Sequence, residues 1–510
     1  MLLVAAACVL LLSLASFAEV LARVGGGSGY GGSKGGGGGG DGEGIAYIIY
    51  LIVRFLIWLT IEYPAVGIPL DIIVISAVIY YFFFRRNRTT KEWSSAATSV
   101  VPSAKETQAS ERQEDVQKEF GRLRRFDPNF SEIIFTDFCY ALYARAQTER
   151  ATGRMNELSP YMSQEARDSL IERNPQGLQE LRGVIVGAMQ IVGAREINFE
   201  GKPFVNITVE FETNYTEVLG QNGNRPREET YYVRERWLLE RKRDVLTPAP
   251  AQATALHCPR CGAALQKDTR GACAFCGAMI ASGEFQWFVR SINLLTREAR
   301  GPLLTSNVPE VGTDAPTVVQ RGFREARAAF EKMNPNFQWG EFMERARLIF
   351  NELQTAWSTL DWERARPHET DNIFQMHRYW IEAYKKQGLR NALDDCRILS
   401  MQPAKITGDA YYNAITLRIG AEGYDYTVDT KGKVVAGSKR NKRRWTEYWT
   451  FIRNRKANPL HSRTDLSCPN CGAPLKVNVT GICEFCGGKV SSGEFDWVLS
   501  KIEQDESYKG

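Results

Sequence analysis

A four-cysteine motif that occurs twice constrains the fold of this chain more than any other feature. The pattern C-x2-C-x11-C-x2-C begins at Cys258 and again at Cys468, 210 residues later. Sixteen of 32 residues are identical between 258–289 and 468–499, which indicates that one unit has been duplicated. Two C-x2-C pairs can place four thiolates around one Zn²⁺ with tetrahedral geometry. The predicted metal ligands are Cys258, Cys261, Cys273, Cys276, Cys468, Cys471, Cys483 and Cys486.

Four thiolates leave no coordination position open for water, so we expect two structural zinc ions and no catalytic one. A pair of disulfides in each motif is the alternative, and it would require an oxidising compartment. We favour metal because the two-residue spacing of C-x2-C recurs four times. Of the other cysteines, Cys139 and Cys396 are expected to be buried, unreactive thiols, and Cys8 lies in the apolar N-terminal run.

The N-terminal 84 residues have the composition of a membrane module. Residues 1–18 are almost wholly apolar and are predicted to be a signal peptide or an uncleaved anchor. Residues 19–44 form a linker, since 14 of the chain's 44 glycines fall within 25–44. Residues 45–84 are the most apolar stretch of the chain and are the predicted transmembrane region.

Within that region, residues 65–84 carry one charge, Asp71, and are long enough to cross about 30 Å of hydrocarbon. Residues 45–61 carry Arg54 and form either a second span or a helix lying in the membrane interface. We expect Arg54 and Asp71 to pair with each other, which lowers the cost of insertion, rather than to serve transport.

Basic residues that follow the apolar region predict the orientation of the chain. Arg85, Arg86, Arg88 and Lys91 come directly after it, and the positive-inside rule places such a cluster in the cytoplasm. The expected location is the inner (plasma) membrane, with the C-terminal domains cytoplasmic. A cleaved signal followed by one crossing fits this orientation, whereas a cleaved signal followed by two spans does not.

A second pair of repeats lies upstream of the cysteine motifs. Asp127-Pro128-Asn129-Phe130 corresponds to Asn334-Pro335-Asn336-Phe337, and each tetrapeptide precedes a helical pattern. Each proline is predicted to lie at a helix start, with Asp127 or Asn334 as the cap. The predicted apolar faces are Phe130, Ile134, Phe138 and Leu142 in the first copy and Phe342, Ala346, Ile349, Leu353, Trp357 and Leu360 in the second.

Strand-like segments follow both helical patterns. Residues 204–211 and 414–419 alternate between apolar and polar, and each copy then reaches a Glu-x-Trp strand, at Glu235 and at Glu447. Helices followed by a meander of strands indicate an α+β fold. The expected domains are a linker at 85–118, a globule at 119–250, a zinc ribbon at 257–289, a linker at 290–325, a globule at 326–458 and a ribbon at 467–499.

Composition and motifs argue against several function classes. The net charge of 64 − 59 = +5 over 510 residues is too small to indicate a nucleic-acid binder. No P-loop, dinucleotide fingerprint, G-x-S-x-G or H-E-x-x-H motif occurs, so we expect no enzyme and assign no catalytic residue. His368 and His377 lie near Asp371, and we interpret them as polar groups at the surface or between helices.

One cluster of basic residues could bind a partner. Lys439, Arg440, Lys442, Arg443 and Arg444 are expected in a hairpin loop before the Glu447 strand. Such a run is most often a solvated loop. If it has a function, it suits anionic lipid headgroups or RNA, and a membrane anchor favours lipid.

The repeated globule resembles the Tim44-like domain family, whose namesake tethers the import motor to the mitochondrial inner-membrane translocase. The residues that carry the resemblance are those of 126–130, 431–437 and 447–453. The first globule departs from the family pattern, with Trp237-Leu238-Leu239 in place of Trp449-Thr450-Phe451. The resemblance implies two cystatin-like or nuclear-transport-factor-like cones, with helices on a curved antiparallel sheet.

By that resemblance the protein is a non-catalytic, membrane-anchored scaffold or tether for a protein client, with protein translocation or membrane biogenesis as the process. A ribosome- or RNA-associated adaptor, or a protein with a lipid-binding pocket, is the alternative. The predicted partners are a protein client and anionic lipids, and nucleic acid is not expected.

Overall fold

The structure is a computed structural model of the chain. It describes residues 60, 62–63, 115–199, 201–221, 224–250, 286–299, 312–457, 462–478, 481–505, 508 and 510. The predicted signal peptide, Gly-rich linker and first cysteine motif therefore lie outside the described residues, as does nearly all of the predicted transmembrane region. In the part of the chain that the structure describes, no helix is both long enough and apolar enough to span a membrane.

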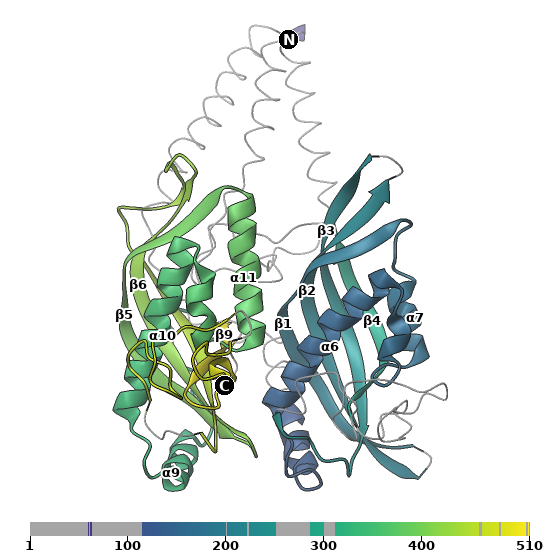
Figure 1. Cartoon of the computed structure of the whole chain (residues 1–510), viewed down its shortest axis with the longest axis horizontal. Coiled ribbons are helices and arrows are strands. Elements are labelled where there is room, and N and C mark those ends of the chain that lie inside the picture. The colour runs from purple at the N-terminus through teal and green to yellow at the C-terminus, as the bar shows by residue number, and fades with distance from the viewer. Residues whose placement is uncertain are drawn as a thin grey trace. The chain divides into compact units, whose positions relative to one another are not determined.

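The first half contains an antiparallel sheet with helices on one face (Figure 1). Its strands pair in the order β1-β2-β3-β4. The strands are β1 (Leu178–Phe199), β2 (Lys202–Gln221), β3 (Asn224–Lys242) and β4 (Phe288–Glu298). The helices are α6 (Glu132–Thr152), the short 3-10 helix η2 (Met155–Leu158) and α7 (Gln164–Ile171).

Helix α6 begins later than the sequence predicted. Its cap is Ser131, whose hydroxyl accepts a hydrogen bond from the Ile134 N–H at 3.2 Å, and it ends at Gly153 with φ 72°. Asp127 is not the cap, because its carboxylate is buried and accepts hydrogen bonds from Arg241 and Thr247 instead. The predicted apolar face is confirmed, since Phe130, Ile134, Phe138 and Leu142 are all buried.

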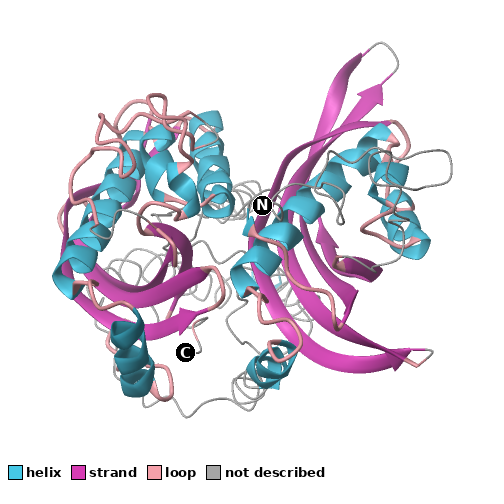
Figure 2. Ribbon diagram, turned by 60° about the horizontal axis from the view of Figure 1, so that its bottom comes forward, coloured by secondary structure: helices cyan, strands magenta, loops and turns pink. Residues whose placement is uncertain are grey.

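The second half contains a second antiparallel sheet, again with helices against one face (Figure 2). The strands are β5 (Leu389–Gly408), β6 (Tyr412–Asp429), β7 (Val434–Gly437), β8 (Arg443–Asn454) and β9 (Val498–Gln504). They pair in the order β5-β6-β8-β9, and β7 also pairs with β6. The helices are α9 (Phe323–Met333), α10 (Trp339–Thr359), the 3-10 helix η3 (Trp362–His368) and α11 (Asp371–Lys386). Both halves are mixed helix and antiparallel sheet, which confirms the α+β prediction.

The core of the second half lies between α10 and the sheet. Five residues of the predicted apolar face are buried: Phe342, Ala346, Ile349, Leu353 and Trp357. The sixth, Leu360, is the C-cap of the helix and has φ 57°. Asn334 is not the predicted N-cap, because it follows α9 as its C-cap and α10 starts only after Gln338. The tetrapeptide therefore forms the turn between two helices.

The cysteine segments do not follow complete globules. Strand β9 comes after the second cysteine segment and pairs with β8, and β4 comes after the first and pairs with β3. The globules therefore extend beyond residues 250 and 458, and the linker expected at 290–325 begins as β4 and later contains the start of α9. Likewise, residues 115–123 of the expected first linker and globule start are helical.

The basic residues at 439–444 do not form the predicted hairpin loop. Strands β7 and β8 pair one after the other with the same edge of β6. Residues 438–442 are therefore a short loop that interrupts this pairing. Arg443 and Arg444 are already the first residues of β8. The loop follows Gly437, which has φ +76°. A Cβ at this position would lie 2.2 Å from the Asp425 carbonyl oxygen, so only glycine fits without a shift of the backbone.

Candidate metal centre

Two backbone turns bring the second set of cysteines together in the connection between β8 and β9. In the first turn, the Gly472 N–H donates to the Cys468 carbonyl at 2.9 Å, and in the second the Gly487 N–H donates to the Cys483 carbonyl at 3.0 Å. Gly472 has φ +76° and Gly487 has φ +71°, a backbone region that favours glycine. The glycine after each C-x2-C pair therefore allows both cysteines of that pair to face the same side.

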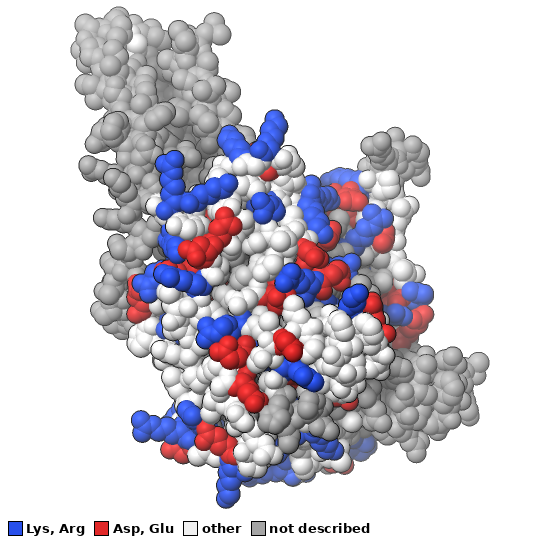
Figure 3. All heavy atoms as spheres, turned by 60° about the vertical axis from the view of Figure 1, so that its left-hand side comes forward, with Lys and Arg blue, Asp and Glu red and all other residues white. Residues whose placement is uncertain are grey.

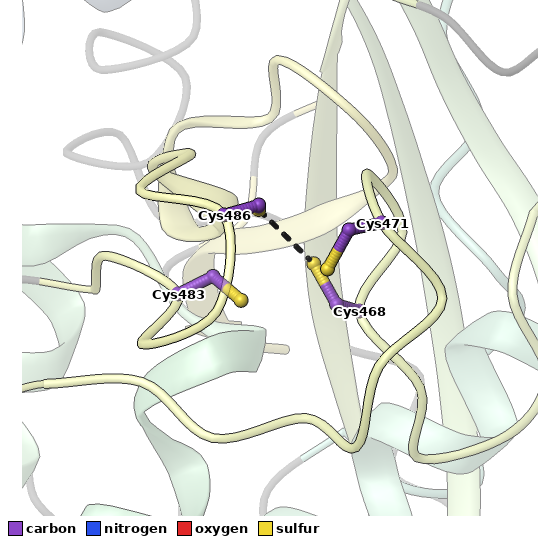
Figure 4. A group of neighbouring side chains, drawn as sticks. All are labelled: Cys468, Cys471, Cys483 and Cys486. Atoms are coloured by element: carbon purple, nitrogen blue, oxygen red, sulfur yellow. Dashed lines mark hydrogen bonds between the residues drawn. The ribbon is translucent and has the colours of Figure 1, made fainter.

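The four thiol groups converge on one point, as Figure 4 shows. The Sγ atoms of Cys468, Cys471, Cys483 and Cys486 all lie within 4.8 Å of one another. Cys468 Sγ is 3.9 Å from Cys486 Sγ. With Zn–S bonds of about 2.3 Å, a regular tetrahedron has edges of about 3.8 Å. A disulfide would need sulfurs about 2.05 Å apart, and all four cysteines are free thiols. The cluster could therefore bind a metal ion.

The surroundings of the sulfurs differ. Cys468 and Cys483 are buried, whereas Cys471 and Cys486 are exposed. Burial raises the pKa of the Cys468 thiol to about 12. The Gly488 backbone N–H lowers the pKa of Cys486 to about 7, and the Asn470 amide, 3.3 Å from its sulfur, acts in the same direction. An ion that binds here must displace the proton of the buried Cys468 and meets donors that already stabilise the Cys486 thiolate.

A buried ion pair and a more exposed one attach the cysteine segment to the helices. Arg345 on α10 is buried and its Nε lies 3.5 Å from the Asp496 carboxylate, which also accepts from the Arg463 N–H at 2.7 Å. Lys489 pairs with Asp371 at the start of α11 at 2.6 Å. The Arg345–Asp496 and Lys489–Asp371 pairs join residues more than 100 positions apart, and the spacing of the cysteines contains no signal for them.

The structure does not bring His368, His377 and Asp371 together as one group. His377 Nδ1 lies 2.7 Å from Glu369 Oε1, and both side chains are buried. Asp371 pairs instead with Arg366 and Lys489. His368 is also buried, and burial, with Arg345 and Arg364 nearby, lowers its pKa well below the ordinary value. The sequence-based interpretation placed these histidines at a surface or between helices, and the structure buries them in the second globule.

The basic residues of 439–444 separate into two groups. Lys442 pairs with Asp395 and Glu422, and the buried Arg443 pairs with Asp425 at 3.3 Å. Lys439, Arg440 and Arg444 are exposed, and the Lys439 ammonium lies 4.8 Å from the centre of the Tyr426 ring. On the face shown in Figure 3, basic and acidic side chains are interspersed. Two members of the predicted basic cluster, Lys442 and Arg443, thus form ion pairs with carboxylates of the same sheet.

Two cysteines outside the motifs, Cys139 and Cys396, are among the described residues, and neither is part of the four-cysteine cluster. Cys139 is buried in the first core, and burial raises the pKa of its thiol well above the ordinary value. Cys396 is partly buried and packs against the second core. Cys8 and the four cysteines of the first motif lie outside the described residues.

The fold and this cluster define an α+β protein with a four-cysteine centre in the connection between two strands of its second sheet. Residues 323–463, from α9 to the end of β8 and a few residues beyond, match the family model of the Tim44-like domain. This match supports the resemblance predicted for the second globule. A search among curated proteins found no match.

Among solved structures, the chain is similar to one described as "Ntf2 like protein involved in plasmid conjugation". The identity is 8%, and the alignment covers 73% of this chain and 94% of the other. The TM-score is 0.17, which is too low for this likeness to carry an argument about either fold or function.

Proposed function

We propose that this protein is a non-catalytic scaffold, anchored in the inner membrane, that holds a protein client there through two Tim44-like domains and two structural zinc ribbons. The Tim44-like match over residues 323–463 is the observation that carries the proposal. The namesake family suggests protein translocation or membrane biogenesis as the process. The C-terminal domains are proposed to be cytoplasmic, where reduced thiols are available to bind zinc.

The order of elements in the two halves supports the proposal that the domain is duplicated. Helices α6 and α10 each have 21 residues. The residue before the next helix then bonds to the last strand in both halves: the Ser163 N–H donates to the Val289 carbonyl and the Thr370 N–H to that of Leu499, each at 2.9 Å. In both, a four-cysteine segment lies in sequence between the last two strands of the sheet order.

The second cysteine cluster supports the proposal of zinc, and the identical spacing at Cys258 extends that proposal to a second ion. The structural role rests on the closed set of four thiolates. The Glu369–His377 pair supports the proposed non-catalytic role, because both side chains are buried in the core, away from solvent.

A tether must change where its client is found. We would place a photo-crosslinking amino acid at Phe485, which is 56% exposed beside the metal cluster, in the full chain in cells. The expected result is a discrete adduct with one protein, whose membrane-bound fraction falls when residues 1–84 are deleted. A client that stays at the membrane after the deletion would contradict the proposal.

Topology is tested separately with reporters fused after Arg88 and after Gly510. Activity of a cytoplasm-specific reporter at both positions is expected. Activity of an export-specific reporter at Gly510 would overturn the proposed orientation and favour extracytoplasmic partners.

A further inference from the structure

The outer face of the second sheet contains a pocket of about 110 Å³. Side chains alternate along β6, so Leu417, Ile419 and Ala421 belong to the core while Gly420 faces away from it. Gly420 pairs with Ser400 on β5 and with Thr446 on β8. A Cβ at Gly420 would lie 2.6 Å from Ser400 Oγ. The pocket therefore exists at this point of the sheet because the central residue has no side chain.

A chain segment that crosses the sheet forms one wall of the pocket. This segment, residues 312–320, is here called the strap. The Arg418 guanidinium donates to the strap carbonyls of Gly312 at 2.8 Å and Ala315 at 2.7 Å. The Gln320 N–H donates to the Ala404 carbonyl on β5 at 2.8 Å. Strap residues Thr313 and Thr317 face the pocket as part of its lining.

The two arginines that line the pocket have different roles. Arg418 is 7% exposed and pairs with Asp505 at 2.9 Å, so its charge is neutralised and its donors hold the strap. Arg444 is exposed, and no ion pair of its side chain occurs among the described residues. Its cross-strand neighbour Glu422 pairs instead with Arg397 at 2.6 Å and with Lys442. Arg444 therefore contributes a positive charge to the pocket that no described acidic residue offsets.

The remaining polar groups of the lining are hydroxyls and one amide. Thr313 Oγ1 is buried and has no hydrogen-bond partner within the described ranges. No aspartate or glutamate is part of the lining. Hydroxyl donors beside a guanidinium suit an oxyanion, because such charge-assisted hydrogen bonds are stronger than neutral ones.

We propose that this pocket binds a phosphate group, with Arg444 as its charge partner and the hydroxyls of Thr313 and Ser400 as hydrogen-bond donors. Its volume is about 110 Å³. A water molecule occupies about 30 Å³ in the liquid, so a tetrahedral oxyanion fits. The group could belong to free inorganic phosphate or to the phosphomonoester headgroup of a lipid. The proposal does not depend on the scaffold function.

Calorimetry on the purified full chain in detergent tests the proposal, with inorganic phosphate and short-chain phosphatidic acid as separate ligands. Arg444→Ala is expected to weaken binding about tenfold, the loss typical of a hydrogen bond to a charged group. Arg440→Ala is the matched control, because Arg440 is an exposed arginine of the same segment that does not line the pocket. Gly420→Ala, which fills the pocket, should abolish binding.

The two ligands identify the source of the phosphate. Binding of phosphatidic acid alone assigns a lipid headgroup, binding of phosphate alone assigns the free ion, and binding of both assigns the group itself, provided that Arg444→Ala weakens it. Absence of binding by either ligand, or equal affinities of the Arg444→Ala and Arg440→Ala variants, would overturn the proposal. Because Arg444 is exposed, its variant remains informative even if Gly420→Ala fails to fold.

Discussion

The indole Nε1 of Trp449 donates a hydrogen bond to Glu447 Oε2 at 2.9 Å, two residues earlier on β8. Alternate residues of a strand share a face, so this carboxylate and indole enter the core together, and both are buried. The first half has the same arrangement, in which Trp237 Nε1 donates to Glu235 Oε2 at 2.8 Å. The Glu-x-Trp pattern of both strands thus corresponds to one local hydrogen bond.

Removal of the Glu447 carboxylate should destabilise the second half. Glu447→Ala leaves the buried Trp449 N–H without this acceptor, at a cost of about 1–3 kcal/mol, whereas Glu447→Gln retains an acceptor oxygen and should cost less. Thermal unfolding followed by near-UV circular dichroism measures both. Glu363→Gln, at an exposed glutamate, is the control. Equal midpoints for Glu447→Ala and wild type would refute the assigned role.

The Asp127–Arg241 pair should contribute strongly to the first half. Both side chains are fully buried, with Arg241 Nη2 2.7 Å from the Asp127 carboxylate. Asp127→Ala leaves an uncompensated buried guanidinium, which typically costs about 3–5 kcal/mol. Hydrogen exchange of the β2 and β3 amides should accelerate accordingly.

A neighbouring ion pair that is only partly buried provides the control. Arg243 pairs with Glu196 near the surface, and a surface pair is worth about 0–1 kcal/mol. Arg243→Ala should therefore leave the exchange of β2 and β3 nearly unchanged. If both variants changed exchange equally, burial would not be the reason for the effect of Asp127→Ala.

Metal content should depend on the cysteine cluster. Cys468→Ser in the full chain is expected to remove about one equivalent of zinc, because loss of one thiolate opens the tetrahedral set. Cys396→Ser is the matched control, since Cys396 is a cysteine outside the cluster. Elemental analysis of the purified variants measures the ratio of zinc to protein. Acidification should also release the metal, because protons compete for the thiolates.

The buried His368 should make stability fall at acidic pH. Its pKa is lowered in the folded state by burial and by Arg345 and Arg364, whereas the unfolded chain titrates near the ordinary value of about 6.5. Below that pH the unfolded state binds a proton that the folded state does not, so stability falls by up to about 1.4 kcal/mol per pH unit. Above it the contribution of this group is fully present.

Urea unfolding between pH 7.5 and pH 5.5 measures this slope. His368→Gln should have a shallower dependence than the wild type below about pH 6.5, and the two slopes should agree at pH 7.5. Identical slopes throughout the range would show that His368 is protonated equally in both states.

Local sequence patterns determined much of the fold. The apolar faces of α6 and α10 followed from helical periodicity, because residues three and four apart lie on one side of a helix. The convergence of the second four cysteines followed from spacing, because a C-x2-C pair with its glycine closes a turn within a few residues. The α+β class followed from the change along the chain between helical periodicity and the two-residue alternation of strands.

Tertiary structure alone decided the roles of groups whose partners are remote in sequence. Asp127 resembled a helix cap but bonds to Thr247, 120 residues away. Arg443 belonged to a basic run but is paired with Asp425 on the neighbouring strand. The cysteine segment follows β8 in sequence, yet β9 returns to the sheet after it. Spacing and periodicity describe only neighbours along the chain, whereas burial and ion pairing depend on which distant segments fold against each other.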